Sequence, residues 1–397
     1  MENPIIFAEN NEDMNYPIGI QTFEKIRTND FAYVDKTALV YRLVKKGTCY
    51  FLSRPRRFGK SLLLSTLKAY FQGKKELFEG LAIAQLEKEW KQYPVLHLDL
   101  NAEQYSTAEA LISTLNLSLL HWEKLYGIGE GEDTIAKRFQ GVIVRAAQQS
   151  PEGKVVVLVD EYDKPLLEAI GNPGLQEEYR KILKAFYSNI KSCDEYIRFA
   201  ILTGETMFSK LSFFSGLNNL WDISLDHHYA ALCGFTQEEM ETVFDKDINK
   251  FATKLKISRE ELLERLKKRY DGYCFSSDLS VKVYNPFSLI CAMEKKSLDI
   301  FWCSTETLNF LADIVNRTDF LLDRLTTEEQ TAEDLMAFGS MYISPIPLFF
   351  QSGYLTIKSY DPEFRTYSLD YPNTEVEQGF AQFMVSYYYG RRHASIT

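Results

Sequence analysis

A Gly59-Lys60-Ser61 tripeptide stands between an apolar, β-prone run and an amphipathic stretch that stops before Gly73. Phosphate binding needs such groups: backbone N–H groups at the start of a helix, a lysine for the β- and γ-phosphates, and a hydroxyl for Mg²⁺. The full signature G-x-x-x-x-G-K-[ST] fails at one position, because Arg54 occupies the place of the first glycine. The tripeptide is common in proteins, so alone it does not establish a phosphate site.

An acidic pair, Asp160-Glu161, follows the apolar run of residues 155–159. At the end of a buried strand the aspartate can hold Mg²⁺, mostly through water, and the glutamate can polarise an attacking water as general base. Such a pair also occurs in solvated loops. With Gly-Lys-Ser upstream, the catalytic interpretation is favoured: Lys60 neutralises phosphate charge, Glu161 activates water, and Ser61 and Asp160 bind the metal.

Further polar residues flank the two motifs. Arg56 and Arg57 could contact phosphate oxygens, a neighbouring subunit or a neighbouring domain with bidentate geometry, or form a solvent-facing basic pair. Thr203, at the end of a later apolar run, could sense the γ-phosphate or act as a cap or turn residue. Asp163 could order Mg²⁺-bound water, but we expect it to cap the next helix. The predicted nucleotide contacts are Arg56, Arg57, Phe58, Gly59, Lys60, Ser61, Leu62 and Asp160, with Lys60, Glu161 and Thr203 in catalytic roles.

A parallel sheet is needed to bring these residues together. Apolar runs at residues 49–53, 95–100, 155–159 and 197–202 predict buried strands, and helical patterns separate them. A fifth strand is expected at residues 220–225. Strands that alternate with helices predict an α/β fold, here a P-loop NTPase sheet of the ASCE/AAA-like type covered by helices. One strand lies between the two motifs and another follows the acidic pair, as in P-loop ATPases with a catalytic glutamate.

The second half of the chain has a different character. Capping-box patterns at residues 236–239 and 258–261 each open a helical stretch. The pattern then becomes helical around residues 308–325, with short strands near 355–358 and 366–369 that suggest a winged-helix-like unit. The predicted division is a P-loop core over 1–230, a helical lid over 231–300 and a winged-helix-like region over 301–397.

Composition limits the partners of the chain. The 397 residues carry a formal charge of −10, from 45 basic and 55 acidic side chains, so nucleic acid is a possible partner that charge does not support. No run of about 18 apolar residues predicts a membrane span, and the first fifteen residues lack the order of a signal peptide, so we expect a cytoplasmic protein without membrane contact. The six cysteines are scattered and expected to be reduced, and the pair His227-His228 is weak evidence for a metal.

Taken together, nine segments resemble the bacterial AAA-ATPase-like family. They extend over nearly the whole chain, and the set is specific although no single piece is. The matching segments are Tyr16-Pro-Ile-Gly-Ile-Gln-Thr-Phe-Glu24, Tyr33-Val-Asp-Lys-Thr37, Arg54-Pro-Arg-Arg-Phe-Gly-Lys-Ser61, Val159-Asp-Glu-Tyr-Asp-Lys-Pro165, Ser215-Gly-Leu-Asn-Asn219, Cys233-Gly-Phe-Thr236, Tyr270-Asp-Gly-Tyr273, Tyr284-Asn-Pro-Phe287 and Tyr371-Pro-Asn373.

The resemblance implies an ATPase core with ATP and Mg²⁺, a helical lid and a winged-helix-like segment. It also implies that the arginine-rich loop, with Arg54 in place of the first glycine, is a family trait. Residues 18–23 and 35–37 resemble an adenine-side clamp. Family members usually continue beyond Pro372-Asn373 into a domain resembling PD-(D/E)XK nucleases, whereas this sequence ends at Thr397, and we expect no nuclease site in these residues.

The leading hypothesis is an Mg²⁺-dependent ATPase that uses its nucleotide state to reposition its C-terminal half. ATP or ADP and a protein effector of unknown identity are the expected partners, and an oligomer is compatible with the sequence. The alternative is a slow or non-hydrolysing nucleotide-gated switch that acts through protein or DNA contact by residues 231–397. Glu161 favours the enzyme, while the missing loop glycine and the lack of a clear partner arginine favour the switch. A third hypothesis is a nonfunctional P-loop scaffold.

Overall fold

The computed structural model describes residues 14–206, 219–303, 305–336 and 344–394. At its centre is a five-stranded parallel sheet, in which β4 separates the strand before the Gly-Lys-Ser loop from the strand that ends in the acidic pair. Because the strands are parallel, their carboxyl ends share one edge, and the predicted α/β P-loop fold is confirmed. The strand order is β2 (Val95–Asp99), β3 (Val155–Asp160), β4 (Ile197–Gly204), β1 (Cys49–Ser53) and β5 (Trp221–Asp222).

The interior strands are buried on both faces. Every residue of β1 and β3 is buried, whereas the edge strand β2 alternates between half-buried and buried positions and ends on the exposed Asp99. A parallel strand with helices on both sides has no solvent face, which accounts for its continuous apolar sequence. The four predicted strands are confirmed. The fifth is shorter than expected, because only Tyr50 and Phe51 of β1 pair with it.

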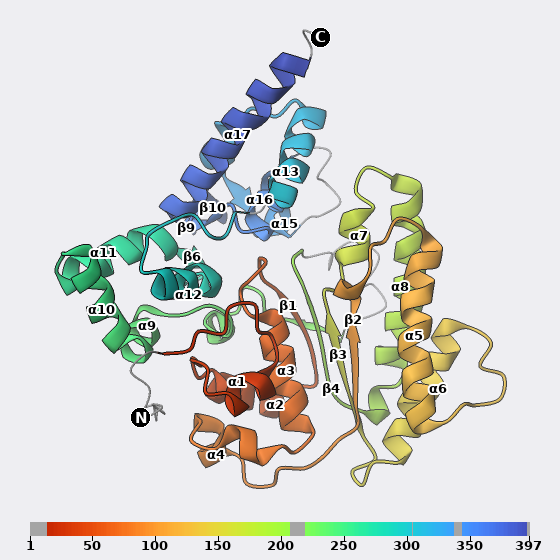
Figure 1. The fold of residues 1–397 in the computed structure, drawn as a ribbon. Coiled ribbons are helices and arrows are strands. Elements are labelled where there is room, and N and C mark those ends of the chain that lie inside the picture. The colour runs from red at the N-terminus through yellow and green to blue at the C-terminus, as the bar shows by residue number, and fades with distance from the viewer. Residues whose placement is uncertain (1–13, 207–218, 304, 337–343, 395–397) are drawn as a thin grey trace.

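Helices cover both faces of the sheet (Figure 1). Helices α1 to α4 lie on one side of it, with α3 packed on β2 and β3, and α5, α6 and α8 lie on the other. Their bounds are α1 (Phe23–Thr28), α2 (Thr37–Lys46), α3 (Lys60–Phe71), α4 (Ala82–Leu86), α5 (Ala108–Tyr126), α6 (Ile135–Gln148), α7 (Lys164–Glu168) and α8 (Pro173–Ser192).

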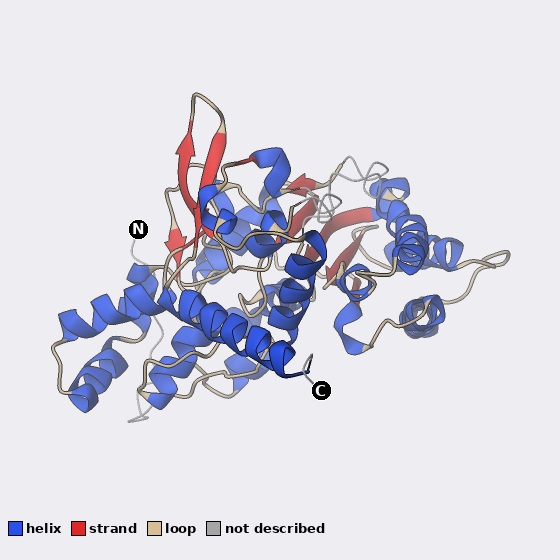
Figure 2. Cartoon of the chain, turned by 90° about the horizontal axis from the view of Figure 1, so that it is seen from above, coloured by secondary structure: helices blue, strands red, loops and turns tan. Residues whose placement is uncertain are grey.

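The second half begins with helices and ends with a small antiparallel sheet in the order β8-β10-β9. Seen from above, the β9–β10 hairpin extends away from the helices around it (Figure 2). The lid and winged-helix interpretations of this half stay predictions. Its elements are α9 (Gln237–Val243), α10 (Asp245–Leu255), α11 (Arg259–Tyr270), β6 (Tyr273–Cys274), β7 (Lys282–Val283), α12 (Pro286–Lys295), α13 (Thr305–Thr318), α14 (Arg324–Thr327), β8 (Gln330–Thr331), α15 (Ala332–Leu335), α16 (Ile346–Gln351), β9 (Thr356–Asp361), β10 (Thr366–Asp370) and α17 (Thr374–Ala394).

Two hydrophobic clusters join the halves of the chain. The larger cluster runs from Phe51 in the central sheet through Trp302 to Phe380 on α17. The smaller cluster lies among α9–α12 and includes Tyr16 and Val34 from the N-terminal segment. The sheet and the C-terminal elements therefore pack against each other around the carboxyl edge of the sheet.

All six cysteines are free and five of them are buried, as the scattered spacing predicted. Within the described ranges, none of the helices combines the length and the apolar character needed to cross a membrane.

Candidate nucleotide-binding site

The phosphate loop connects the end of β1 to the start of α3. Gly59 occupies the position before the helix with φ +93°, a left-handed conformation that L side chains rarely adopt. A Cβ built on Gly59 would meet no atom within 4 Å, so the space in front of the loop is open. The first N–H groups of α3 have no partner within the helix and carry the positive end of its dipole. The loop therefore offers the N-terminal helix groups that bind phosphate.

Arg54 anchors the loop from behind. Its guanidinium is buried and donates to the carbonyl oxygens of Ser53, Ser224 and Tyr229 at 2.8, 2.7 and 3.3 Å. It also lies 4.2 Å from the ring centroid of Phe275. Burial lowers the pKa of Arg54 to about 10, so the side chain is still cationic at neutral pH. The missing signature glycine is thus replaced by a residue that fastens the loop to neighbouring segments.

Lys60 is the cation of the loop that faces the acidic pair. Its Nζ lies 3.0 Å from the carbonyl oxygen of Arg54 and 3.4 Å from Oε1 of Glu161. Burial alone would lower the pKa of Lys60, but the nearby carboxylates, Glu161 and then Glu205, outweigh burial and raise it. Lys60 is therefore charged and held next to the predicted general base.

Asp160 ends β3 and is oriented by its neighbours. The hydroxyl of Thr203 donates to Oδ1 of Asp160 at 2.8 Å, and the backbone N–H of Glu161 donates to the same oxygen at 3.1 Å. Neither Asp160 nor Thr203 belongs to the described lining of the cavity. Thr203 therefore contacts the predicted metal ligand, and its γ-phosphate-sensing role stays a prediction.

Glu161 adopts a backbone conformation that is uncommon for its residue type, with φ +51°. Strained backbone of this kind persists where the surrounding structure enforces it, and it clusters at functional sites. Burial, supported by repulsion from Glu205 and Asp163, raises the pKa of Glu161 to about 7 against the attraction of Lys60. A carboxyl with a pKa near neutrality suits a general base.

The expectation that Asp163 caps the next helix is wrong. It stands at the N-cap position of α7 but makes no capping hydrogen bond. Its carboxylate instead accepts from the backbone N–H and hydroxyl of Thr206 at 2.6 and 2.5 Å and from the N–H of Glu205. Burial, then repulsion from Glu205, raises the pKa of Asp163 to about 6. The carboxylate of Asp163 therefore holds the backbone of Glu205 and Thr206 in place, directly after β4.

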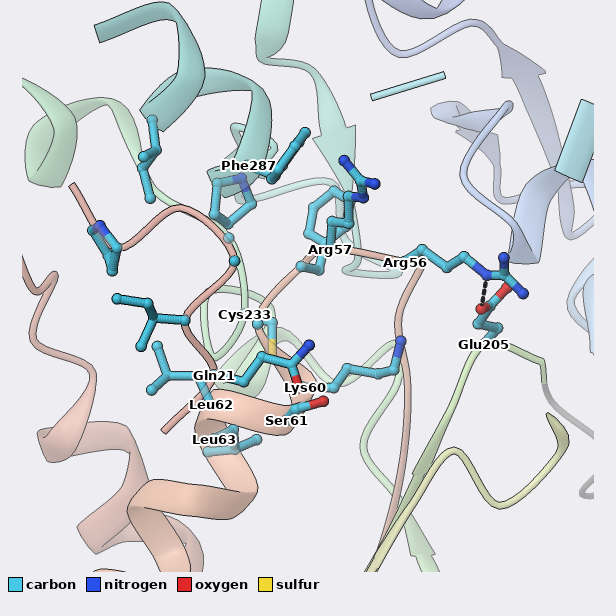
Figure 3. Close-up of a pocket in the computed structure, with 18 of the residues that line it drawn as sticks. Gln21, Arg56, Arg57, Lys60, Ser61, Leu62, Leu63, Glu205, Cys233 and Phe287 are labelled. Carbon is cyan, nitrogen blue, oxygen red and sulfur yellow. Dashed lines mark hydrogen bonds and ion pairs between the residues drawn. The ribbon is translucent and has the colours of Figure 1, made fainter. Parts of the chain in front are cut away.

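The two loop arginines are held by different partners. Arg56 forms an ion pair with Glu205, drawn in Figure 3, and its carbonyl oxygen accepts from Nε1 of Trp302 at 3.0 Å. The guanidinium of Arg57 lies 3.9 Å from the ring centroid of Phe287 on α12. The structure therefore links both arginines to the second half of the chain, and Arg56 also to the residue that follows β4.

A cavity of about 710 Å³ opens over the loop, a size typical of small-molecule sites. Lys60, Ser61, Leu62 and Glu161 line it, together with Arg56, Arg57, Phe58 and Gly59. The ring of Phe58 itself packs against Tyr273 and Phe275, with centroids 4.8 and 5.3 Å away. The predicted residues thus gather at one end of a single cavity, with Asp160 and Thr203 set behind it.

The opposite end of the cavity comes from segments to which motif spacing assigned no role in the site. Residues 17–21 and 32–34 form part of this wall, and residues 233–235 and Phe287 of the second half also line the cavity. Several of these residues belong to the family-like segments, so their types were a signal, but no spacing rule placed them here. Glu205 and Trp302 carry no motif and were missed. The family-like residues 215–218 lie outside the described residues.

The oxygen donors of the site fit Mg²⁺. A serine hydroxyl in the first turn of α3 and a carboxylate at the end of β3 are hard oxygen ligands, which this ion prefers. Because Asp160 is set back from the cavity lining, its contact to the ion is expected to run through water, which Mg²⁺ retains readily.

A second group of potential metal ligands lies elsewhere, at Asp226, His227 and His228. Their ligand atoms lie within 4.8 Å of one another, closer than the sequence alone indicated. Asp226 caps a short 3-10 helix here, accepting from the N–H of His228 at 2.9 Å. Capping accounts for this arrangement without a metal.

Comparisons with known proteins find a matching family model and a similar protein. The family model described as Predicted AAA-ATPase matches residues 17–214. A relative from Azotobacter chroococcum mcd 1, named an uncharacterized protein in the vnfD 5′ region, is 39% identical over 381 residues, covering 94% of this chain and 70% of that protein.

Two solved structures show a distant likeness. A Walker-type ATPase of Pyrococcus abyssi matches with a TM-score of 0.45 and 13% identity, over 94% of this chain and 99% of that one. The ORC1 protein of Aeropyrum pernix, in complex with DNA, matches with a TM-score of 0.26 and 13% identity, over 88% and 93%. With TM-scores below 0.5, neither structure assigns a role to a residue here.

Proposed function

We propose that this chain, which belongs to the predicted AAA-ATPase family, binds ATP with Mg²⁺ over the phosphate loop and hydrolyses it to ADP and phosphate. The observation that carries the proposal is the pairing of Lys60 with Glu161 at 3.4 Å, next to the glycine loop and at the end of a 710 Å³ cavity. The alternative, that a phosphate-binding lysine, a strand-end glutamate and an open helix N-terminus meet in one cavity by chance, is a poor one.

Each residue has a distinct role in the proposed reaction. Lys60 and the N–H groups of the loop hold the phosphate oxygens, and Ser61 and Asp160 hold Mg²⁺, which supplies further neutralisation of phosphate charge. Glu161 accepts a proton from water as the water oxygen bonds to the γ-phosphorus. The bond between the γ-phosphorus and the β–γ bridging oxygen breaks, and its electron pair leaves with ADP.

The adenosine moiety is assigned to the wall formed by the N-terminal segment. Ile18, Ile20 and Val34 make this end of the cavity apolar, as a base-binding surface requires. Asp35 and Thr37, which the family resemblance placed in a clamp, have their side chains turned to the protein: Asp35 accepts from the N–H groups of Thr37 and Ala82 at 2.8 and 2.7 Å. These two residues are proposed to shape the clamp and not to touch the base.

The C-terminal half is proposed to respond to the nucleotide through direct loop contacts. The guanidinium of Arg57 stacks on Phe287, and the carbonyl oxygen of Arg56 accepts from Nε1 of Trp302. A Cβ built on Gly353 would come within 2.7 Å of Pro55. Such close packing allows little independent movement of the loop and its neighbours. A change in the loop is therefore expected to shift the elements that carry these residues.

Binding is tested by titration of ATP against wild type and Lys60→Ala. Loss of a charge-assisted hydrogen bond is expected to weaken ATP affinity by about 10- to 100-fold. Lys164→Ala is the matched control, because Lys164 also lines the cavity but donates to Asn101. Equal affinity of wild type and Lys60→Ala would refute the assignment of the phosphate loop.

One observation favours the slower switch as a second candidate. Glu161, the proposed base, is paired with Lys60 and has a pKa raised by burial to about 7, so part of the population is protonated at neutral pH. A base that is held and partly protonated lowers turnover without preventing binding. Tight ATP binding with no phosphate release in wild type would select the switch.

A further inference from the structure

The ion pair of Arg56 and Glu205 lies where a γ-phosphate would compete for the arginine. Both residues line the cavity that contains Lys60 and Glu161. The carboxylate of Glu205 is 8% exposed and comes directly after β4, whereas the Arg56 side chain is 45% exposed and extends from the loop. An exposed arginine can change partner, and a buried carboxylate without its arginine cannot be solvated well.

Glu205 itself is fixed in place by its backbone. Its carbonyl oxygen accepts from the hydroxyl of Ser53 at 2.7 Å, and its N–H donates to Asp163. Around it, the cations Lys60, Arg56 and Arg57 line the cavity together with Glu161. The carboxylate of Glu205 repels an added phosphate charge unless the Arg56 guanidinium moves between the two anions.

The loop side of Arg56 is connected to the end of the chain. The carbonyl of Arg56 accepts from Nε1 of Trp302, and the backbone N–H of Trp302 donates to Oε1 of Glu375 at 3.0 Å. Glu375 is fully buried in the first turn of α17 and accepts from Phe301 as well, at 2.6 Å. A continuous set of hydrogen bonds thus runs from the phosphate loop to α17.

We propose that Arg56, Glu205 and Trp302 make the site distinguish ATP from ADP. The γ-phosphate of ATP takes Arg56 from Glu205, and the shifted main chain at Arg56 alters its hydrogen bond to Trp302 and, through Glu375, the position of α17. ADP, which lacks the γ-phosphate, leaves Arg56 on Glu205. This inference rests on the proposed ATP-binding function and adds the residues that read the nucleotide and pass its state on.

The test compares a non-hydrolysable ATP analogue with ADP, both at saturation. The tryptophan fluorescence of wild type minus that of Trp302→Phe gives the contribution of Trp302. Trp221→Phe is the control, because it removes a tryptophan remote from the site. We expect the analogue and not ADP to change the Trp302 contribution. Amide exchange in α17 is a second readout that needs no variant, and it is expected to change with the analogue alone.

Glu205→Gln separates the ion pair from general effects of charge. Without nucleotide, its Trp302 contribution is expected to shift toward that of wild type with the analogue, because a neutral amide holds Arg56 less strongly than the carboxylate does. Glu168→Gln removes an equal charge from the same cavity lining and is expected to keep the wild-type pattern.

The outcomes separate this inference from the function on which it rests. If both nucleotides bind and change Trp302 and α17 equally, or not at all, the inference is overturned and the ATP site stands. If Glu168→Gln and Glu205→Gln behave alike, the ion pair is not the discriminating element. If a calorimetric titration detects no nucleotide binding, the ATP site and the inference both fail.

Discussion

At the scale of residues, two cations of the site are held by carboxylates. Lys60 and Arg56 are each shared, since Lys60 contacts Glu161 and a loop carbonyl while Arg56 is paired with Glu205. A charged group held in this way responds to any new charge in the cavity. The raised pKa of Glu161 is the clearest consequence, and it makes the proposed reaction depend on pH.

The pH dependence has a definite sign. Burial raises the pKa of Glu161 to about 7, so the base is mostly protonated at pH 6 and mostly ionised at pH 8. Because only the ionised carboxylate accepts a proton, kcat for ATP hydrolysis is expected to rise about tenfold over this range. A pH-rate profile of wild type measures it. A flat profile between pH 6 and 8 would exclude Glu161 as the base.

Thr203 supports the metal by orienting Asp160. Thr203→Val removes the hydroxyl that donates to Oδ1 of Asp160 at 2.8 Å and is expected to raise the Mg²⁺ concentration for half-maximal ATPase activity by about tenfold. Thr203→Ser keeps the donor and should behave as wild type. Unchanged Mg²⁺ dependence in the valine variant would show that Asp160 needs no such support.

The sequence predicted some of these residues and not others, for a physical reason. Asp160 and Glu161 stand at the end of a buried strand and Lys60 at the start of the helix after another, a spacing that follows from the sheet. Glu205 and Trp302 become part of the site only through tertiary contacts between segments far apart in the chain. No local pattern marks such residues before the chain is folded.

At the scale of elements, the phosphate loop is held by its own strand and by its neighbours. Arg54 replaces the signature glycine and satisfies three carbonyl oxygens from β1 and the segment after β5. The sequence showed that Arg54 occupies the glycine position of the signature. Its role as an anchor could not be predicted, because it depends on tertiary contacts with carbonyl oxygens behind the loop.

Restoring the signature glycine is therefore expected to harm the protein. Arg54→Gly leaves buried carbonyl oxygens without donors and should lower the free energy of unfolding by about 3 kcal/mol. Urea denaturation followed by circular dichroism measures this loss. Arg54→Lys keeps the charge but not the fork of donors, and an intermediate stability is expected. A glycine variant as stable as wild type would contradict the anchoring role.

Secondary structure was predictable where burial or capping gives a strong local signal. The runs that form β1 to β4 are confirmed, and the capping box at Thr236 and Glu239 is present at the start of α9. The two-residue strands β6, β7 and β8 were not predicted, because a strand of that length shows no periodicity. No element was predicted for the segments that form α1 and α2, although the apolar residues of α2 recur at helical spacing, with Val40, Leu43 and Val44 buried.

At the scale of the whole molecule, the N-terminal clamp is tied to the second half. Nζ of Lys36 lies 2.7 and 2.5 Å from the two carboxylate oxygens of Glu239. Burial lowers the pKa of Lys36, and Glu239 opposes that shift. The pair bridges the wall of the cavity and α9, so it couples the nucleotide end of the core to the helices after it.

This bridge can be measured with a double-mutant cycle on Lys36→Met and Glu239→Gln. Glutamine keeps the oxygen that accepts from Thr236, so the cap of α9 is retained. A coupling free energy of about 1–2 kcal/mol in unfolding is expected. The exposed pair Lys74 and Glu24 is the matched control and should give a coupling near zero. Equal coupling in both pairs would show that the bridge does not tie the halves together.

The most direct test of the ATPase is phosphate release from ATP with Mg²⁺ by wild type and Glu161→Gln at matched nucleotide occupancy. Our account predicts that wild type releases phosphate, and that Glu161→Gln binds ATP with similar affinity but turns over about 10²- to 10⁴-fold more slowly. Similar turnover by the two proteins would contradict the account, because the reaction would then not depend on the proposed base.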